Sequence, residues 1–114
     1  SGTSRIAGIR SSYADFAQSS AAERKALVSA EQQIREAYRT MSEAAASYTL
    51  SQAQIADAEL TLSATRKRYE LGSATLLELL DAEIALEQAQ MQRVTALANF
   101  RRAKAKIEWL TGEK

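Results

Sequence analysis

Large apolar side chains recur at every seventh position over the first part of this sequence. The series comprises Ile6, Tyr13, Leu27, Ile34, Met41, Tyr48, Ile55, Leu62 and Tyr69, with Ser20 as the one exception. Three residues after each of these comes a mostly small position: Ile9, Phe16, Glu23, Ala30, Ala37, Ala44, Ser51, Ala58 and Thr65. Two seam positions in every seven residues are typical of a coiled-coil helix, and small residues at one of them let the facing helix approach closely. The pattern predicts one long helix over residues 5–71.

The sequence Ser20-Ala21-Ala22-Glu23 could also cap a new helix, so a break near residues 19–20 is an alternative. Continuity is the preferred interpretation, because the seven-residue phase holds across this site. Residues 1–4 are expected to be a disordered cloning remnant.

A second segment repeats the pattern and predicts a returning helix over residues 75–111. Its large seam positions are Leu79, Leu86, Phe100 and Ile107, with Arg93 as the exception, and its small ones are Ala82, Ala89, Ala96 and Ala103, followed by Leu110. A second, weaker apolar stripe comprises Leu80, Ile84, Met91, Val94, Ala98 and Ala105. A helix with two apolar stripes contacts two neighbours, and a lone hairpin would leave the second stripe in water.

The two segments meet at residues 72–74, where a glycine interrupts the run of helix-forming residues. Gly72 suits the left-handed conformation that ends a helix, and the cations at residues 66–68 complement the helix dipole before it. Thr75 and Glu78 have the spacing of a capping box that starts the next helix, although Ser73 is a rival first cap. We therefore expect a tight reversal, an αα-hairpin, with a short tail at residues 112–114.

The arms of this hairpin are unequal, so residues 5–35 have no partner within the chain. Apolar side chains in this stretch, such as Tyr13, Phe16 and Leu27, need cover. The isolated chain is therefore expected to associate with itself, or to come from a larger protein that supplies the missing wall.

The composition offers little for catalysis. The 114 residues include no His, Cys or Pro, so the usual general base, thiol nucleophile and imidazole ligand are missing, and no enzyme is expected. The net charge of +1 gives no electrostatic footprint for nucleic acid, and no apolar run has the length of a membrane helix. The carboxylates Glu78, Asp81 and Glu83 could bind a hard cation, but helix N-terminal electrostatics explain them better. We expect no metal and no cofactor.

The turn and the arm after it resemble one family. The segment YELGSATLLELLDAE fits the motif Tyr-x-x-Gly-x-x-(Ser/Thr)-hydrophobic-x-(Asp/Glu)-hydrophobic-Leu-Asp-Ala of the outer-membrane efflux proteins, the TolC-like channel family. The matching residues are Tyr69, Gly72, Thr75, Glu78, Leu80, Asp81 and Ala82. The upstream stretch ALVSAEQQIREAYRTMSEA is similar to the family's long ascending helix, so the resemblance extends over nearly the whole chain.

The resemblance implies a long antiparallel coiled-coil hairpin that is a fragment of a periplasmic α-barrel, the hairpin of the second repeat. Members of the family are homotrimers in the outer membrane of Gram-negative bacteria. Their hairpin turns meet the tips of a periplasmic adaptor (membrane fusion) protein in a tripartite efflux pump or a type I secretion system. This fragment itself is expected to make no direct membrane contact.

Residue by residue, the resemblance concerns the turn. It implies an adaptor-binding surface made of Tyr69, Leu71, Gly72, Ser73, Ala74, Thr75 and Leu76. Glu78 and Asp81 match acidic positions that ring the closed periplasmic entrance in some members; three copies of each would attract cations and repel one another. Some relatives place Arg or Lys two positions after the glycine to tie the tips shut, whereas this sequence has Ala74 there.

Two other functions remain open from the sequence. One is a free-standing coiled-coil scaffold or homodimerisation module without a transport role, whose tip is only a turn. The other, a metal-binding helical bundle, is less favoured, because such sites use inward Glu and His side chains and the seams here are apolar.

Overall fold

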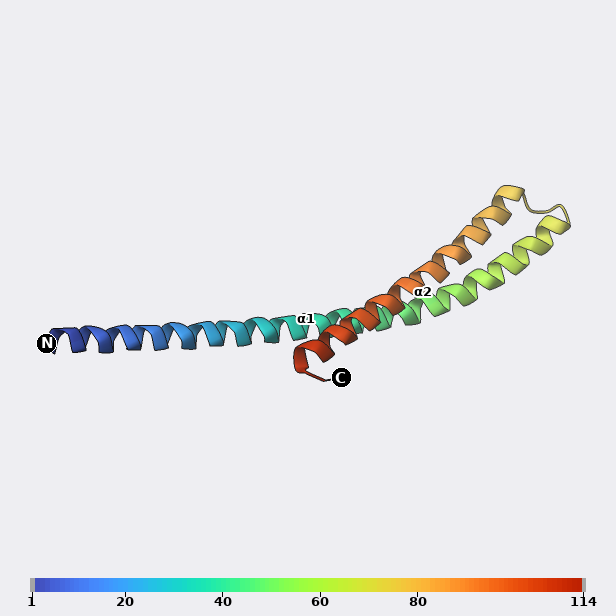
Figure 1. Cartoon of the computed structure of the whole chain (residues 1–114). Coiled ribbons are helices and arrows are strands. Elements are labelled where there is room, and N and C mark those ends of the chain that lie inside the picture. Colours follow the sequence, from blue (N-terminus) through green and yellow to red (C-terminus); the bar gives the residue numbers. More distant parts are fainter. Residues whose placement is uncertain (1, 114) are drawn as a thin grey trace. The chain divides into compact units, whose positions relative to one another are not determined.

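The computed structural model describes residues 2–113 and contains two helices, α1 (Gly2–Glu70) and α2 (Leu76–Thr111) (Figure 1). These residues include no strand. The chain divides into two compact units, the first of which ends at Glu36. We call residues 2–36 the N-terminal unit and residues 37–113 the hairpin unit, and each is described by itself. The predicted all-α fold with a long helical hairpin is confirmed.

The helix bounds differ slightly from those that the sequence suggests. Residues 2–4 belong to α1, whereas disorder is expected there. Small residues are tolerated at this place because the first N–H groups of a helix need no intrahelical partner. α1 is helical at Ser19 and Ser20, where a break was an alternative, and it ends at Glu70 because Leu71 already belongs to the turn. Ser1 and Lys114, at the ends of the two expected terminal segments, lie outside the described residues.

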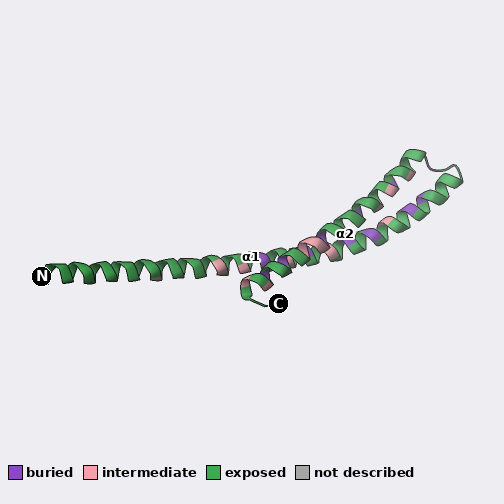
Figure 2. Ribbon diagram, viewed as in Figure 1, coloured by how far each residue is buried: buried purple, intermediate pink, exposed green. Residues whose placement is uncertain are grey.

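In the hairpin unit, α2 runs back antiparallel to the part of α1 that precedes the turn (Figure 1). The side chains that are buried between them are mostly the small members of the two seams. They are Ala37, Ala44, Ser51, Ile55, Leu62 and Thr65 in α1, and Ala82, Ala89, Ala96, Ala103 and Ile107 in α2. Ser51 and Ala96 are the most deeply buried, with 1% and 2% of their surface exposed. Figure 2 shows these buried positions at intervals along both arms.

The larger seam residues flank this line of small ones. Met41, Tyr48, Leu79, Leu86 and Phe100 are each partly buried. Small residues at the centre allow the two backbones to approach closely, and the larger side chains then cover the contact from its borders. The segregation of large and small seam positions therefore sets how the two helices pack.

Two hydroxyl side chains lie in the seam, and each of them makes a hydrogen bond there. Ser51 Oγ donates to the carbonyl oxygen of Tyr48 at 2.7 Å, and Thr65 Oγ1 donates to that of Thr61 at 2.7 Å. Each hydroxyl thus finds its partner within its own helix, so small polar residues can replace alanine there. No buried side-chain nitrogen or oxygen among residues 2–113 lacks a hydrogen-bond partner.

The N-terminal unit consists of the first part of α1 and buries no side chain among residues 2–36. Its large apolar residues are exposed, except for Ile34, which is partly buried; the exposed ones are Ile6, Ile9, Tyr13, Phe16, Leu27 and Val28. Five of these six occupy the same two seam positions that are buried or partly buried in the hairpin unit. The seam therefore continues through the N-terminal unit, and most of its large apolar side chains are exposed there.

The second apolar stripe of α2 is also exposed. Leu80, Ile84, Met91 and Val94 each keep at least two fifths of their surface accessible. Exposed apolar stripes of this kind mark contact surfaces. As expected for a lone hairpin, α1 does not cover this side of α2.

Candidate partner-binding site at the hairpin tip

The turn begins where α1 closes on itself. Gly72 N–H donates to the carbonyl oxygen of Tyr69 at 3.0 Å, and Ser73 N–H donates to that of Arg68 at 2.7 Å. This nested pair is a Schellman motif, which satisfies carbonyl groups that would otherwise lack a partner at the helix end. Gly72 has a φ of +79°, a left-handed conformation that favours glycine. The prediction that Gly72 ends the helix is thus confirmed.

The turn ends in a capping box. Thr75 is the N-cap of α2, and its Oγ1 accepts a hydrogen bond from Glu78 N–H at 3.1 Å. The carboxylate of Glu78 in return accepts from Thr75 N–H at 2.7 Å. Two N–H groups at the helix start are satisfied in this way. The structure therefore decides between the two caps that the sequence offers, in favour of Thr75 over Ser73.

Arg68 connects the two halves of the turn. Its guanidinium Nη2 donates to the carbonyl oxygen of Ser73 at 3.0 Å and lies 4.0 Å from Glu78 Oε2. Its own carbonyl oxygen accepts from Ser73 Oγ at 3.1 Å and from Ala74 N–H at 3.2 Å. The sequence indicates only a cation near a helix C-terminus, since the ten-residue separation from Glu78 has no meaning until the turn is formed.

Three leucines around the turn are exposed, and we call them the tip leucines. Leu71 has 83% of its surface exposed, Leu77 68% and Leu76 55%. Leu71 and Leu76 are among the residues that the sequence proposes for partner binding, whereas Leu77 is not. The sequence nevertheless indicated that Leu77 is exposed, because Leu76 and Leu77 both lie off the seam that Leu79 defines.

The other proposed contact residues differ in what they present. Tyr69, Gly72, Ser73 and Thr75 are exposed, although the hydroxyls of Ser73 and Thr75 are already engaged within the turn. Ala74 is buried, so its methyl group is not accessible to a partner. The exposed surface of the turn therefore combines the tip leucines with polar and charged side chains, among them those of Arg68 and Glu78.

The two acidic residues proposed for the entrance also differ. Glu78 and Asp81 are both exposed. The carboxylate of Glu78 serves the capping box and faces Arg68, so part of its charge is balanced locally. The sequence predicts the capping-box role of Glu78, whereas it does not predict the contact with Arg68.

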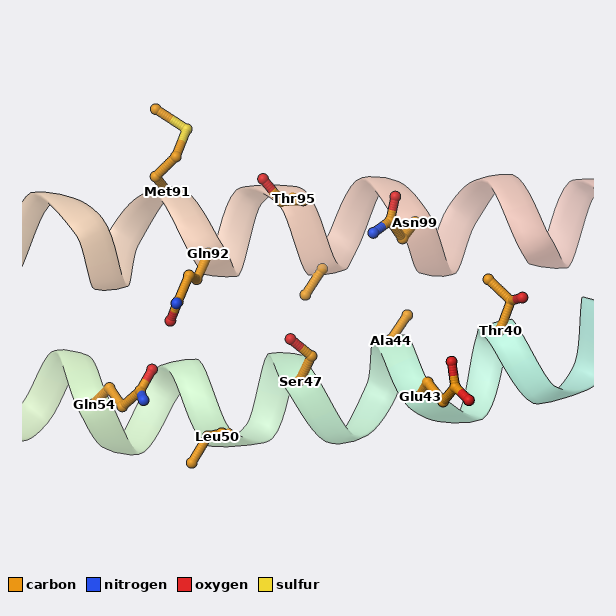
Figure 3. A pocket seen from close by; sticks show the side chains of 11 residues that line it. Thr40, Glu43, Ala44, Ser47, Leu50, Gln54, Met91, Gln92, Thr95 and Asn99 are labelled. Carbon is orange, nitrogen blue, oxygen red and sulfur yellow. The ribbon is translucent and has the colours of Figure 1, made fainter.

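A groove lies between the two helices at some distance from the tip (Figure 3). It has a volume of about 430 Å³, and Glu43 is the one ionisable residue among those that line it. Its wall is mostly apolar, and the polar part comes from amide and hydroxyl groups such as those of Gln54, Gln92 and Asn99. The groove arises because the seam residues below it, Ala44 and Ala96, are small, and it contains no set of groups for acid–base or nucleophilic chemistry.

Residues 2–113 contain neither a cluster of metal ligands nor a membrane-spanning helix. No group of three or more carboxylate, imidazole or thiol side chains is placed to hold a metal ion. Neither α1 nor α2 contains a stretch that is both long and apolar enough to cross a membrane.

Comparison with known proteins identifies the family. The family model described as Outer membrane efflux protein matches residues 1–113. A search of curated proteins found no match, and neither did a search of solved structures. The family comprises channel components that export compounds through the outer membrane of Gram-negative bacteria, work with periplasmic adaptor proteins and form trimers, and it is not a family of enzymes. The match spans both helices and the turn, and it agrees with the resemblance carried by the turn motif: the chain belongs to the outer membrane efflux protein family.

Proposed function

We propose that this chain is the periplasmic helical hairpin of an outer-membrane efflux channel, and that its tip docks a periplasmic adaptor protein. The observation that carries the proposal is the set of tip leucines, exposed on a turn whose two ends are both capped. Fully burying one leucine side chain contributes about 1.5–3 kcal/mol, and a preformed turn loses little entropy on binding. The partner surface is accordingly expected to be apolar.

The second apolar stripe of α2 supports an assembly of several copies. A hairpin on its own leaves Leu80, Ile84, Met91 and Val94 in water, and packing of another helix against this face would remove them from it. A homotrimer, the assembly known for the family, supplies such helices. The exposed tip leucines favour a channel hairpin over a free-standing scaffold, whose turn would need no exposed apolar side chains.

The acidic residues of the tip fit a role at the channel entrance. In a trimer, three copies of Asp81 near the axis would attract cations and repel one another, which favours opening once an adaptor holds the tips. We assign this role to Asp81 rather than to Glu78, because the Glu78 carboxylate is engaged in the capping box. Transport by a tripartite pump or by a type I secretion system is compatible with this arrangement.

Docking is tested by removing the apolar surface of the tip without touching its hydrogen bonds. The variant Leu71→Ser/Leu77→Ser should weaken binding to a panel of purified adaptor hairpins by more than about tenfold, since each leucine contributes over 1 kcal/mol when buried. Surface plasmon resonance measures the affinity, and circular dichroism checks that helix content is unchanged.

Leu60 provides the matched control. It is as exposed as the tip leucines but lies ten residues before the end of α1, away from the turn, so Leu60→Ser should leave adaptor affinity unchanged. Unaltered affinity of the double tip variant, or an equal loss for Leu60→Ser, would remove the proposal that the tip is the docking surface.

A further inference from the structure

The turn is held by two separate sets of hydrogen bonds. The first, the Schellman motif, fixes residues 71–73 to the end of α1 through the carbonyl oxygens of Arg68 and Tyr69. The second, the capping box, fixes Thr75 to the start of α2 through Glu78. The backbone hydrogen bonds of the first set extend as far as Ala74, whose N–H lies 3.2 Å from the carbonyl oxygen of Arg68, and they do not reach Thr75 or Glu78.

One side chain joins these two sets. The guanidinium of Arg68 donates to the carbonyl oxygen of Ser73, at the last residue of the first set, and lies 4.0 Å from Glu78 Oε2 in the second. Ser73 Oγ donates back to the carbonyl oxygen of Arg68, so these two residues are linked in both directions. A planar guanidinium can serve two acceptors at once, which an ammonium group does less well.

We infer that Arg68 is a positioning residue that clamps the tip, fixing Leu71 at the end of α1 relative to Leu76 and Leu77 at the start of α2. Arg68 and Glu78 are both about half exposed, so their ion pair adds little to the stability of the helices. The ion pair acts instead by restricting the conformations of the turn. A partner then loses less entropy on binding, because the tip leucines already occupy fewer alternative arrangements. The docking part of this inference rests on the function proposed above.

The clamp is tested first without any partner, in the 114-residue chain. Arg68→Ala should speed amide hydrogen exchange at Ser73, Ala74 and Thr75, as resolved by nuclear magnetic resonance, while the helix content and the melting temperature stay as in the wild type. Lys67→Ala is the matched control. It removes a cation from the same last turn, but the Lys67 side chain makes no hydrogen bond or ion pair with the described residues.

Two conservative variants separate the contacts of the clamp. Arg68→Lys keeps the charge but not the planar guanidinium with its several donors. It should therefore bring the exchange rates only part of the way from those of Arg68→Ala to those of the wild type. Glu78→Gln keeps a residue that can complete a capping box while removing the ion pair. It should therefore give a smaller increase in exchange than Arg68→Ala, which also loses the bond to Ser73.

The second arm measures affinity for the panel of purified adaptor hairpins. If loss of the clamp leaves about one fifth of the molecules in the competent arrangement, the apparent affinity falls about fivefold. We expect that loss for Arg68→Ala, a smaller one for Arg68→Lys and none for Lys67→Ala. Unchanged exchange at residues 73–75 in Arg68→Ala would overturn the clamp. The clamp would also be overturned if Arg68→Ala and Lys67→Ala lowered the melting temperature by the same amount.

The two arms keep the clamp and the docking function apart. If no wild-type chain binds any adaptor hairpin, the proposed function fails, whereas the exchange rates still decide whether Arg68 holds the turn. If the wild type binds and Arg68→Ala binds equally well despite faster exchange, the role of the clamp in docking is overturned while docking itself stands.

Discussion

Leu62 and Leu27 occupy the same position of the seven-residue repeat, yet 8% of the surface of Leu62 is exposed and 70% of that of Leu27. Leu62 belongs to the hairpin unit, where α2 supplies the facing wall, and Leu27 belongs to the N-terminal unit, where no side chain is buried. The comparison shows that a heptad predicts which side of a helix will be apolar. It does not say whether the chain itself supplies the partner for that side.

The largest expected effect comes from truncating these two leucines. Leu62→Ala should lower the free energy of unfolding by about 2–4 kcal/mol, because it leaves a cavity in the seam. Leu27→Ala should change it by less than about 0.5 kcal/mol, since the side chain is already in water. Urea unfolding at low protein concentration, followed by circular dichroism, measures both. Similar losses for the two variants would show that the seam of the N-terminal unit is covered in solution, and would break the comparison.

Enlarging the small seam position gives the next effect. Ala44→Leu should destabilise the hairpin unit by about 1–3 kcal/mol, because Ala44 is buried against α2 and a leucine there must displace its neighbours in the seam before it reaches the groove. Ala30→Leu, at the same heptad position in the N-terminal unit, should stay within about 0.5 kcal/mol of the wild type. Thermal melting curves of the two variants test this, and tolerance of Ala44→Leu would contradict close packing of α1 on α2.

The same substitution at two glycines should have opposite signs. Gly72→Ala should destabilise by about 1–2 kcal/mol, since a φ of +79° is unfavourable for alanine although the space around it is open. Gly8→Ala should stabilise the N-terminal unit by about 0.5–1 kcal/mol, because Gly8 lies within α1. Gly72→Asn, which tolerates this conformation better, should fall between Gly72→Ala and the wild type in a chemical unfolding series. A loss at Gly8 equal to that at Gly72 would indicate an unexpected contact near Gly8.

The smallest effect concerns an ion pair in the N-terminal unit. Arg35 Nη2 lies 2.6 Å from Glu31 Oε1, one helical turn apart, and both side chains are well exposed. Glu31→Gln should lower helix stability by about 0.3 kcal/mol at low salt and by nothing measurable near 1 M salt, where screening acts within about 3 Å. Helix content measured along a salt titration checks this. An effect that persists at high salt would point to a contact other than the ion pair.

At the tip, the sequence predicted the turn chemistry well and the surface chemistry in part. Gly72, Thr75 and Glu78 carry local signals whose partners lie within a few residues, so the glycine-ended helix and the capping box could be read directly. Arg68 could not be assigned, because its contact with Glu78 requires the chain to reverse first. The burial of Ala74 likewise depends on how α2 leaves the turn.

The sequence by itself determined the two helices, the reversal at Gly72 and the line of small residues along which the helices meet, because helix period, capping and chain reversal depend on neighbouring residues. The unequal lengths of the two arms also indicated which part of the seam has no partner within the chain. The tertiary structure alone decided that Arg68 joins the two caps and that Ala74 is buried beside the turn. These features depend on groups that are distant in the chain and are brought together only when α2 packs on α1.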